Sequence, residues 1–420
     1  MKDFVVAHLK KRGFIDAVTS EDLLLKASSP LKLYLGFDPT ADSLHLGNLV
    51  GIIALTWFEK FGHTPYALLG GATGKIGDPS GKSQERPFLS YELLEHNIGC
   101  IEKQLIRCIG HPLIVNNDTW FKEMPFIDFL RDVGKHFRVG SMLGKESVRS
   151  RIQSEEGMSF TEFSYQLMQA YDFYHLYEKE GVVLQMGGSD QWGNITAGIE
   201  LIRKLTRKEA FGATFPLLTR SDGKKFGKSE EGAIWLSKEK TSPYAFYQYL
   251  YQVADADVVK LLKMLTFIEL EEIEEMEREI KIHPNRAQKR LAEEVTLYVH
   301  GAEGLEIALR VTEGAKPGQD IELDLETLEA IKEDMPNVTL SKDQVVGQTY
   351  PALGVLSSLF SSKGEAVRLL KNGGAYLNNR KISDEKEVVC ESDLIGGKYL
   401  VLGSGKKKKL LIEISSLSRR

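Results

Sequence analysis

Cysteine is scarce in this chain of 420 residues: Cys100, Cys108 and Cys390 are the only three, and they lack CxxC or zinc-site spacing. Such sparse use is typical of a reducing compartment. Long apolar runs are also missing, since none reaches the roughly 18 residues that a membrane helix needs. Residues 1–20 have neither the apolar stretch nor the cleavage site of a signal peptide. We therefore expect a cytoplasmic protein.

Neither sign of charge dominates the chain, which has a net charge of -5 and is 42% hydrophobic. These totals are typical of a folded protein, and the length predicts two or three domains. Residues 351–420 differ, because their 13 basic and 7 acidic side chains give a net charge of +6. A basic segment on an acidic body favours contact with a polyanion, although a solvated basic surface has the same composition.

Short β-rich runs alternate with helical patterns over about the first 215 residues. The runs cover residues 31–37, 65–71, 111–117 and 182–188, and FPLLTRS at 215–221 is a further candidate strand. We expect one helix to begin at Asp42 or Ser43 and end at Gly62, and another to begin at Ser189 or Asp190. This alternation predicts an α/β fold with a parallel sheet and helices on both faces.

The remaining patterns divide the chain further. Residues 1–220 are predicted to form the α/β domain, with a helical insertion at about 120–180. Residues 221–325 start with a lysine-rich loop and continue as long charged helices, and the acidic residues 326–350 are expected to be a linker. Residues 351–420 then have a compact α+β pattern.

The stretch DPTADSLHLGN, residues 38–48, lies between the first strand and the next helix. A helix N-terminus at the carboxyl end of a parallel strand is a phosphate site, because its backbone N–H groups are unpaired and positive. Thr40, His45 and Asn48 add hydrogen-bond donors, and Gly47 allows a ligand to approach the backbone. The alternative is that His45 and Asn48 only cap the helix.

A lysine-rich loop, DGKKFGKSEEG, covers residues 222–232. Lys224, Lys225 and Lys228 could close over a triphosphate and stabilise charge as a phosphate is attacked. The alternative is a solvated basic turn. GDPSGKS at 77–83 is not a P-loop, because that motif requires glycine where Ile76 stands, and Asp78 would repel phosphate.

Polar side chains form a stripe on the helix predicted at FSYQLMQAYDFYHLY, residues 163–177. Tyr165, Gln169 and Asp172 are spaced i, i+4 and i+7, so they share one helix face. A hydroxyl, an amide and a carboxylate suit a small polar-aromatic ligand, although Asp172 could instead form a buried salt bridge. The strand end LQMGGSDQWGN, residues 184–194, combines glycines with an acidic residue, as ribose recognition requires.

These motifs together resemble a known family, the bacterial-type tyrosyl-tRNA synthetases. His45-Leu46-Gly47-Asn48 and Lys225-Phe226-Gly227-Lys228-Ser229 resemble the two signatures of class I aminoacyl-tRNA synthetases, with Asn48 in place of the usual second histidine. The segment SSKGEAVRLLKNGGAYLNNRKISD, residues 361–384, resembles an S4-type RNA-binding module. The resemblance implies a Rossmann-like catalytic domain with a helical insertion, then an α-helical domain on the anticodon-arm side, and a small α+β S4-like domain.

The resemblance also implies a role for each matching residue. For catalysis these are Thr40, His45, Asn48, Lys82, Arg86, Lys225 and Lys228, although Lys82 and Arg86 could equally be surface charge. Tyrosine would be bound by Tyr34, Asp78, Tyr165, Gln169, Asp172 and Gln191, and ATP by Gly36, Asp38, Gly47, Asp190 and Lys228. RNA would be bound by Lys363, Arg368, Lys371, Arg380 and Lys381.

The implied activity is that of a tyrosine–tRNA ligase, which forms tyrosyl-adenylate from tyrosine and ATP and then charges tyrosine tRNA. Mg²⁺ would arrive with ATP, since the sequence offers no dedicated metal ligands. Family members are homodimers, which implies a homodimer here. The helical insertion is the expected dimer surface. Two alternatives remain: a tryptophanyl-tRNA synthetase, and a non-catalytic RNA-binding protein with a vestigial nucleotide site.

Overall fold

The computed structural model describes residues 4–415, except 81, 83, 85–87, 154–156, 230–231, 284, 315–323, 326–327, 330–331, 333–334 and 406–407. The chain divides into two units, each with its own sheet and hydrophobic core. The first contains Met1–Ser237 and Gln252–Leu291, and the second contains Lys238–Tyr251 and Ala292–Arg420. Within the described residues, no helix combines the length and apolar character needed to cross a membrane.

The first unit is built on a six-stranded sheet with the order β1-β6-β5-β2-β3-β4. All neighbouring pairs are parallel except β1 with β6, so the predicted parallel sheet is confirmed and gains an antiparallel edge. The strand predicted at 215–221 is wrong, because β6 ends where Pro216 removes the backbone donor that the ladder requires. The strands are β1 (Ala17–Val18), β2 (Lys32–Phe37), β3 (Thr64–Leu69), β4 (Leu113–Asn116), β5 (Val182–Gly188) and β6 (Phe211–Phe215).

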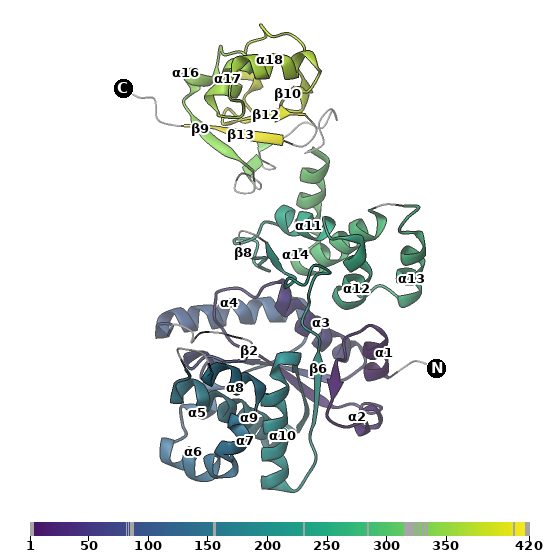
Figure 1. Ribbon diagram of the computed structural model, residues 1–420, viewed down its shortest axis with the longest axis vertical. Helices are drawn as coiled ribbons and strands as arrows, with labels where there is room; N and C mark the ends of the chain where they lie inside the picture. Colours follow the sequence, from purple (N-terminus) through teal and green to yellow (C-terminus); the bar gives the residue numbers. More distant parts are fainter. Residues whose placement is uncertain are drawn as a thin grey trace. The chain divides into compact units, whose positions relative to one another are not determined.

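Helices cover both faces of this sheet (Figure 1). Successive side chains of β2 point to opposite faces, and they meet different helices. Leu35 packs against α3 at Gly51, whereas the Tyr34 ring lies 5.4 Å from the Phe173 ring of α9. The main helices of the two layers are α3 (Leu46–Lys60), α4 (Tyr91–Ile109), α9 (Phe160–Glu180) and α10 (Trp192–Thr206).

The segment between β4 and β5 is helical, as the sequence predicts. Within this segment a buried ion pair joins Arg151 and Glu162 at 2.9 Å, with side chains only 2% and 3% exposed. Loss of one partner would leave an uncompensated buried charge, so this pair fixes the approach of α8 to α9. The elements before α9 are α5 (Asp118–Phe121), α6 (Phe126–Asp132), η2 (Gly134–His136), α7 (Val139–Leu143) and α8 (Glu146–Ile152).

The start of α3 differs from the prediction, because its N-cap is His45 and not Asp42 or Ser43. His45 Nδ1 accepts a hydrogen bond from the Gly47 amide at 3.1 Å, and Asn48 Oδ1 accepts one from the His45 amide at 3.1 Å. This capping box satisfies two backbone donors that a helix start otherwise leaves unpaired. After β5 the chain forms the short 3₁₀ helix η3 (Ser189–Gln191), so α10 begins at Trp192, later than predicted.

A buried arginine joins the N-terminal helix to a helix of the 252–291 segment. Arg12 is 1% exposed and donates to the backbone oxygens of Lys263 and Thr266 at 3.0 and 3.1 Å, and to that of Ile268. These oxygens lie at the C-terminus of α12, where a cation offsets unpaired carbonyls. The elements here are α1 (Val5–Lys11), α2 (Asp22–Lys26), α12 (Asp255–Leu265), α13 (Leu270–Glu279) and the start of α14 (Arg286–Gly314).

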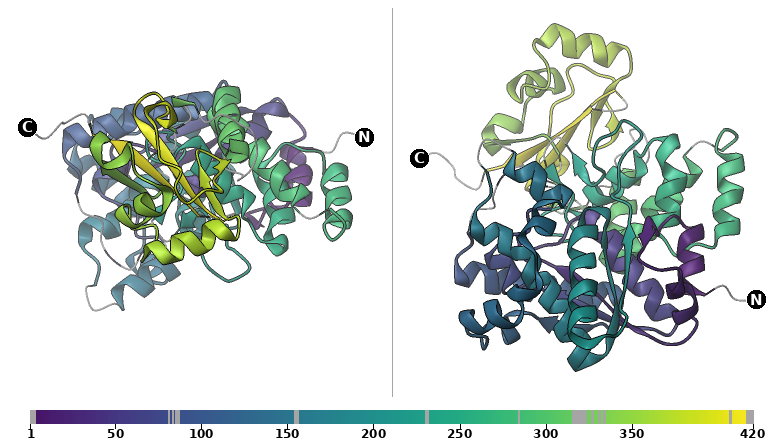
Figure 2. Two further views of the ribbon diagram at one scale, coloured as in Figure 1. Left: turned by 90° about the horizontal axis from the view of Figure 1, so that it is seen from above. Right: turned by 60° about the horizontal axis from the view of Figure 1, so that its bottom comes forward.

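The second unit contains α11 (Pro243–Tyr251), most of α14 and a small domain. The small domain has a five-stranded sheet with the order β11-β10-β12-β13-β9, and its yellow strands lie beside yellow-green helices (Figure 2). The compact α+β pattern predicted for residues 351–420 is confirmed. The elements of the small domain are β9 (Asn337–Leu340), β10 (Ala375–Leu377), β11 (Arg380–Lys381), β12 (Tyr399–Ser404), β13 (Lys408–Ile414), α16 (Lys342–Val345), α17 (Tyr350–Leu356) and α18 (Lys363–Lys371).

The predicted domain boundaries differ from the structure in two places. β9 pairs in parallel with β13, and Val345 and Tyr350 are buried in the same core, so residues 337–350 belong to the small domain and are not a linker. The acidic composition of the segment hid these few apolar positions. The predicted helical domain at 221–325 is also divided, because its residues belong to both units.

Candidate active site

A cleft of about 400 Å³ opens at the carboxyl ends of β2 and β5 in the first unit. Parallel strands bring their carboxyl ends to one edge of a sheet, which is where open α/β sheets bind ligands. Arg86 lies outside the described residues. All other residues predicted for catalysis, tyrosine or ATP line the cleft: Tyr34, Gly36, Asp38, Thr40, His45, Gly47, Asn48, Asp78, Lys82, Tyr165, Gln169, Asp172, Asp190, Gln191, Lys225 and Lys228.

Two buried polar side chains mark one end of the cleft. Asp172 is 2% exposed, and its oxygens accept hydrogen bonds from Asn117 Nδ2 at 3.1 Å and Trp120 Nε1 at 2.9 Å. Burial raises the pKa of Asp172 to about 8, although both hydrogen bonds oppose the shift. Tyr34 is 1% exposed, and its hydroxyl has no hydrogen-bond partner among the described residues. Burial and the nearby charge of Asp172 raise the pKa of Tyr34.

A second cluster, joined by side-chain amides, lies around Asp78. Gln191 Nε2 donates to Asp78 Oδ2 at 2.7 Å, and Gln169 Nε2 donates to Gln191 Oε1 at 3.3 Å. Asn194 Nδ2 contacts both amide oxygens, at 3.0 Å from Gln169 and 3.2 Å from Gln191. These hydrogen bonds hold the amide side chains of Gln169 and Gln191 in fixed positions beside the Asp78 carboxylate, and all three residues line the cleft.

Asp38 connects the strand end to α9. Its two oxygens accept hydrogen bonds from Tyr165 at 2.8 Å and Thr73 at 2.8 Å. Burial raises the pKa of Tyr165, and the charges of Asp38 and Asp78 raise it further. Asp38 was predicted among the ATP-binding residues, and the structure places it against Tyr165, a residue predicted to bind tyrosine. The carboxylates and the phenol together make this part of the cleft favourable for a cation.

The lysine loop is attached to the start of α3 by backbone hydrogen bonds. The Leu46 amide donates to the Ile234 oxygen at 2.8 Å, and the Leu236 amide donates to the Leu44 oxygen at 2.8 Å. The hairpin of β7 (Lys228–Ser229) and β8 (Gly232–Ala233) therefore places Lys225 and Lys228 at the same cleft as His45. Both lysines are exposed, as is Lys82.

Gly36 and Gly188 line the cleft at the ends of their strands. A Cβ at Gly36 would meet nothing closer than Leu68 Cδ2 at 3.8 Å, so the protein's own packing does not require glycine there. A Cβ at Gly188 would lie 2.6 Å from Asp190 Oδ1, which shows how closely that carboxylate approaches the backbone. Burial and the charge of Asp78 raise the pKa of Asp190.

Sequence reasoning missed the residues that hold the predicted ones in place. Asn117 and Trp120 bind Asp172, Thr73 binds Asp38, and Asn194 binds Gln169. A signal was available for Asn117, because it directly follows the strand β4 at the same edge of the sheet. The contacts of Trp120 and Asn194 depend on where distant helices pack, which no local pattern encodes.

Comparisons with known proteins agree with this geometry. Residues 26–314 match the family described as tRNA synthetases class I (W and Y), and residues 327–412 match the tyrosine–tRNA ligase SYY-like C-terminal domain. A tyrosine–tRNA ligase of Protochlamydia amoebophila (strain UWE25) is 54% identical, covering 97% of this chain and 98% of that protein. This chain belongs to the tyrosine–tRNA ligase family.

Proteins named as organellar are also similar to this chain. The chloroplastic/mitochondrial tyrosine–tRNA ligase of Arabidopsis thaliana is 52% identical, covering 98% of this chain and 84% of that protein. Among solved structures, a C-terminally truncated mitochondrial tyrosyl-tRNA synthetase of Aspergillus nidulans has a TM-score of 0.67 at 33% identity, covering 73% of this chain and 92% of that one. The predicted class I aminoacyl-tRNA synthetase identity and fold are thus confirmed.

The five residues predicted to bind RNA lie in the part matched by the tyrosine–tRNA ligase C-terminal domain. All five are exposed; three lie on α18 and two on β11. Arg380 pairs with Glu387 at 2.6 Å, so part of its charge is offset. Within the described residues, this family member has no cluster of three or more His, Cys, Asp or Glu side chains that could hold a metal ion.

Proposed function

We propose that the cleft activates tyrosine with ATP and then transfers tyrosine to the 3′-terminal adenosine of tyrosine tRNA. The family identity supports the reaction. The observation that carries the assignment to this cleft is the unpartnered, buried Tyr34 hydroxyl together with the buried Asp172 carboxyl group. Buried polar groups cost free energy unless they are hydrogen-bonded, so this pair is complementary to a polar ligand.

The phenol of tyrosine fits between these two groups. Its hydroxyl can donate one hydrogen bond and accept others, so it can donate to Asp172 and accept from Tyr34. Phenylalanine would fill the same space and leave both groups buried without the partner, which is the more costly outcome. The pocket therefore selects tyrosine through its hydroxyl.

The ammonium group of tyrosine would lie among Asp78, Tyr165 and Gln169. Asp78 and the neighbouring Asp38 supply negative charge, and Gln169 supplies an acceptor held by Asn194 at 3.0 Å. Gln191, which is bonded to Asp78, would contact the carboxyl group of the substrate. This end of the amino acid then points toward the start of α3.

ATP would lie across the glycine-rich strand ends. Gly36 and Gly47 allow close approach, Asp190 would bind the ribose hydroxyls, and Thr40, His45 and Asn48 would face the phosphates. A tyrosine carboxylate oxygen attacks the α-phosphorus, and the bond to the leaving pyrophosphate breaks. The cations Lys82, Arg86, Lys225 and Lys228 would stabilise the charge that develops, which is electrostatic catalysis. Mg²⁺ would enter with ATP and neutralise the leaving group.

The partners follow from the exposed surfaces of each unit. The basic residues Lys363, Arg368, Lys371, Arg380 and Lys381 would contact tRNA phosphates. A second copy of the chain would cover the helical insertion, where several large apolar side chains are exposed: Phe126 63%, Ile127 69%, Val139 60% and Phe160 69%. The sparse use of cysteine favours a cytoplasmic location.

Amino-acid-dependent pyrophosphate exchange tests the proposal. Tyrosine should support exchange, whereas tryptophan and phenylalanine should support little. Exchange with tryptophan but not tyrosine would contradict the pocket assignment, and no exchange with any amino acid would favour a non-catalytic RNA-binding protein.

A further inference from the structure

The hydrogen bonds beneath the tyrosine pocket converge on Asn117, which is 0% exposed. Its Oδ1 accepts from the Ala72 amide at 2.7 Å. Its Nδ2 donates to Thr73 Oγ1 at 3.0 Å and to Asp172 Oδ2 at 3.1 Å. Because Thr73 in turn binds Asp38, a displacement of Asn117 would disturb both carboxylates of the cleft.

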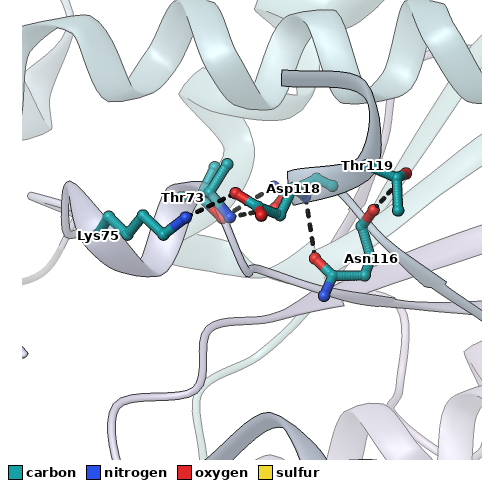
Figure 3. A network of polar contacts seen from close by, with 7 residues as sticks. Thr73, Lys75, Asn116, Asp118 and Thr119 are labelled. Atoms are coloured by element: carbon teal, nitrogen blue, oxygen red, sulfur yellow. Dashed lines mark hydrogen bonds and ion pairs between the residues drawn. The ribbon is translucent and has the colours of Figure 1, made fainter. Parts of the chain in front are cut away.

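An ion pair between Lys75 and Asp118 lies beside this network (Figure 3). Lys75 Nζ lies 2.6 Å from Asp118 Oδ1, and the two side chains are 38% and 18% exposed. Lys75 ends the 3₁₀ helix η1 (Thr73–Lys75), and Asp118 follows Asn117 directly at the start of α5. The pair therefore joins the segment that carries Thr73 to the segment that carries Asn117.

Further contacts fix the two segments that the pair joins. Asn116 Oδ1 accepts from the Asp118 amide at 2.9 Å, and the Asn116 backbone oxygen accepts from Thr119 Oγ1 at 2.8 Å (Figure 3). A Cβ at Gly71 would lie 2.2 Å from Asn116 Oδ1, so the segments touch on the inner side. Lys75 Nζ also lies 5.2 Å from the centre of the Tyr91 ring on α4.

We propose that Lys75 and Asp118 are positioning residues for tyrosine recognition, whose ion pair sets the spacing between η1 and α5 and so holds Asn117 against Asp172. Neither side chain lines the cleft, so neither contacts the substrate. The inference rests on the proposed function, because it concerns the pocket assigned to tyrosine.

Loss of the ion pair should change the KM for tyrosine modestly and leave the other kinetic constants nearly the same. A partly exposed ion pair contributes little free energy, so Asp118→Asn or Lys75→Met should raise the KM for tyrosine about threefold to tenfold. The KM for ATP and the kcat of exchange should change less than about twofold, because uniform binding of one substrate is lost. Discrimination against phenylalanine should fall as well, since Asp172 is less well held.

The variants are compared in tyrosine-dependent pyrophosphate exchange, with thermal unfolding to show that each is folded. Because the two substitutions remove the same interaction, the double variant should resemble either single one. The exchanged pair Lys75→Asp with Asp118→Lys should restore the KM for tyrosine at least in part. A merely structural role would lower Tm and kcat without this rescue.

Lys10 provides a matched control. Its side chain is also 38% exposed and pairs with Glu21 at 3.3 Å, and neither residue lines the cleft. Lys10→Met should leave the KM for tyrosine unchanged. An unchanged KM in both Asp118→Asn and Lys75→Met would overturn the inference, while a wild-type protein without any tyrosine-dependent exchange would instead contradict the proposed function.

Discussion

At the end of the cleft that we propose binds tyrosine, the buried Asp172 carboxyl group is held by two hydrogen bonds from neutral side chains. At the end that we propose binds the phosphates of ATP, Lys82, Lys225 and Lys228 are exposed. The difference suits the two tasks. Discrimination between similar amino acids requires a rigid buried pocket, whereas charge stabilisation of a departing pyrophosphate requires cations that can follow the reaction.

The largest effect is expected at the phosphate end. Lys228→Ala should slow adenylate formation by about 10²- to 10³-fold, because a cation aimed at developing charge is lost. Tyrosine affinity should stay nearly the same, since Lys228 is far from the phenol in this assignment. Pre-steady-state adenylate formation and equilibrium tyrosine binding measure the two quantities. Lys26→Ala, which removes another exposed lysine, is the control. An unaltered rate of adenylate formation in Lys228→Ala would contradict the proposed difference between the two ends of the cleft.

A smaller loss is expected at the tyrosine end. Asp172→Asn should lower kcat/KM for tyrosine by roughly 10- to 100-fold, because the amide that replaces the carboxyl group leaves a buried donor without a partner facing the substrate hydroxyl. Tyr34→Phe should cost only about twofold to tenfold, since it removes a bond between neutral groups. The kcat/KM for phenylalanine should change little in either variant. Equal losses for tyrosine and phenylalanine would show that these side chains support the pocket without reading the hydroxyl.

The small domain has exposed basic side chains that we propose bind tRNA. Arg368→Ala with Lys371→Ala should raise the KM for tRNA about tenfold and reduce its salt dependence, because phosphate contacts release counterions. Pyrophosphate exchange, which needs no tRNA, should be unaffected. Aminoacylation assays at several salt concentrations measure the KM for tRNA and its salt dependence. A change in the rate of pyrophosphate exchange would indicate a folding defect instead.

The pH dependence of stability gives a further test of the buried end of the cleft. The folded-state pKa of Asp172 is about 8, well above its unfolded value of about 3.9. The folded state therefore binds the proton more tightly, and its stabilising contribution is present below about pH 4 and is lost as the pH rises toward 8. The Tm of the wild type should fall relative to Asp172→Asn across this range. A constant Tm difference would show that the carboxyl group is already ionised.

Sequence patterns predicted the cleft well because its residues follow local rules. Tyr165, Gln169 and Asp172 share a face through helix periodicity, and Asp38 and Asp190 follow strand ends that a parallel sheet brings to one edge. The cap of α3 was misplaced because histidine is an unusual N-cap, yet His45 accepts from the Gly47 amide while Asn48 accepts from the His45 amide. β9 was missed because its partner, β13, lies about 70 residues later in the chain.

The sequence by itself determined most strands of the parallel sheet and which side chains meet at its carboxyl edge, because residue spacing and backbone geometry are local. Only the tertiary structure decided that Asp172 is held by Asn117 and Trp120 and that the Tyr34 hydroxyl is buried without a partner. Those properties depend on which distant segments exclude water from a side chain, and packing settles that after the elements have formed.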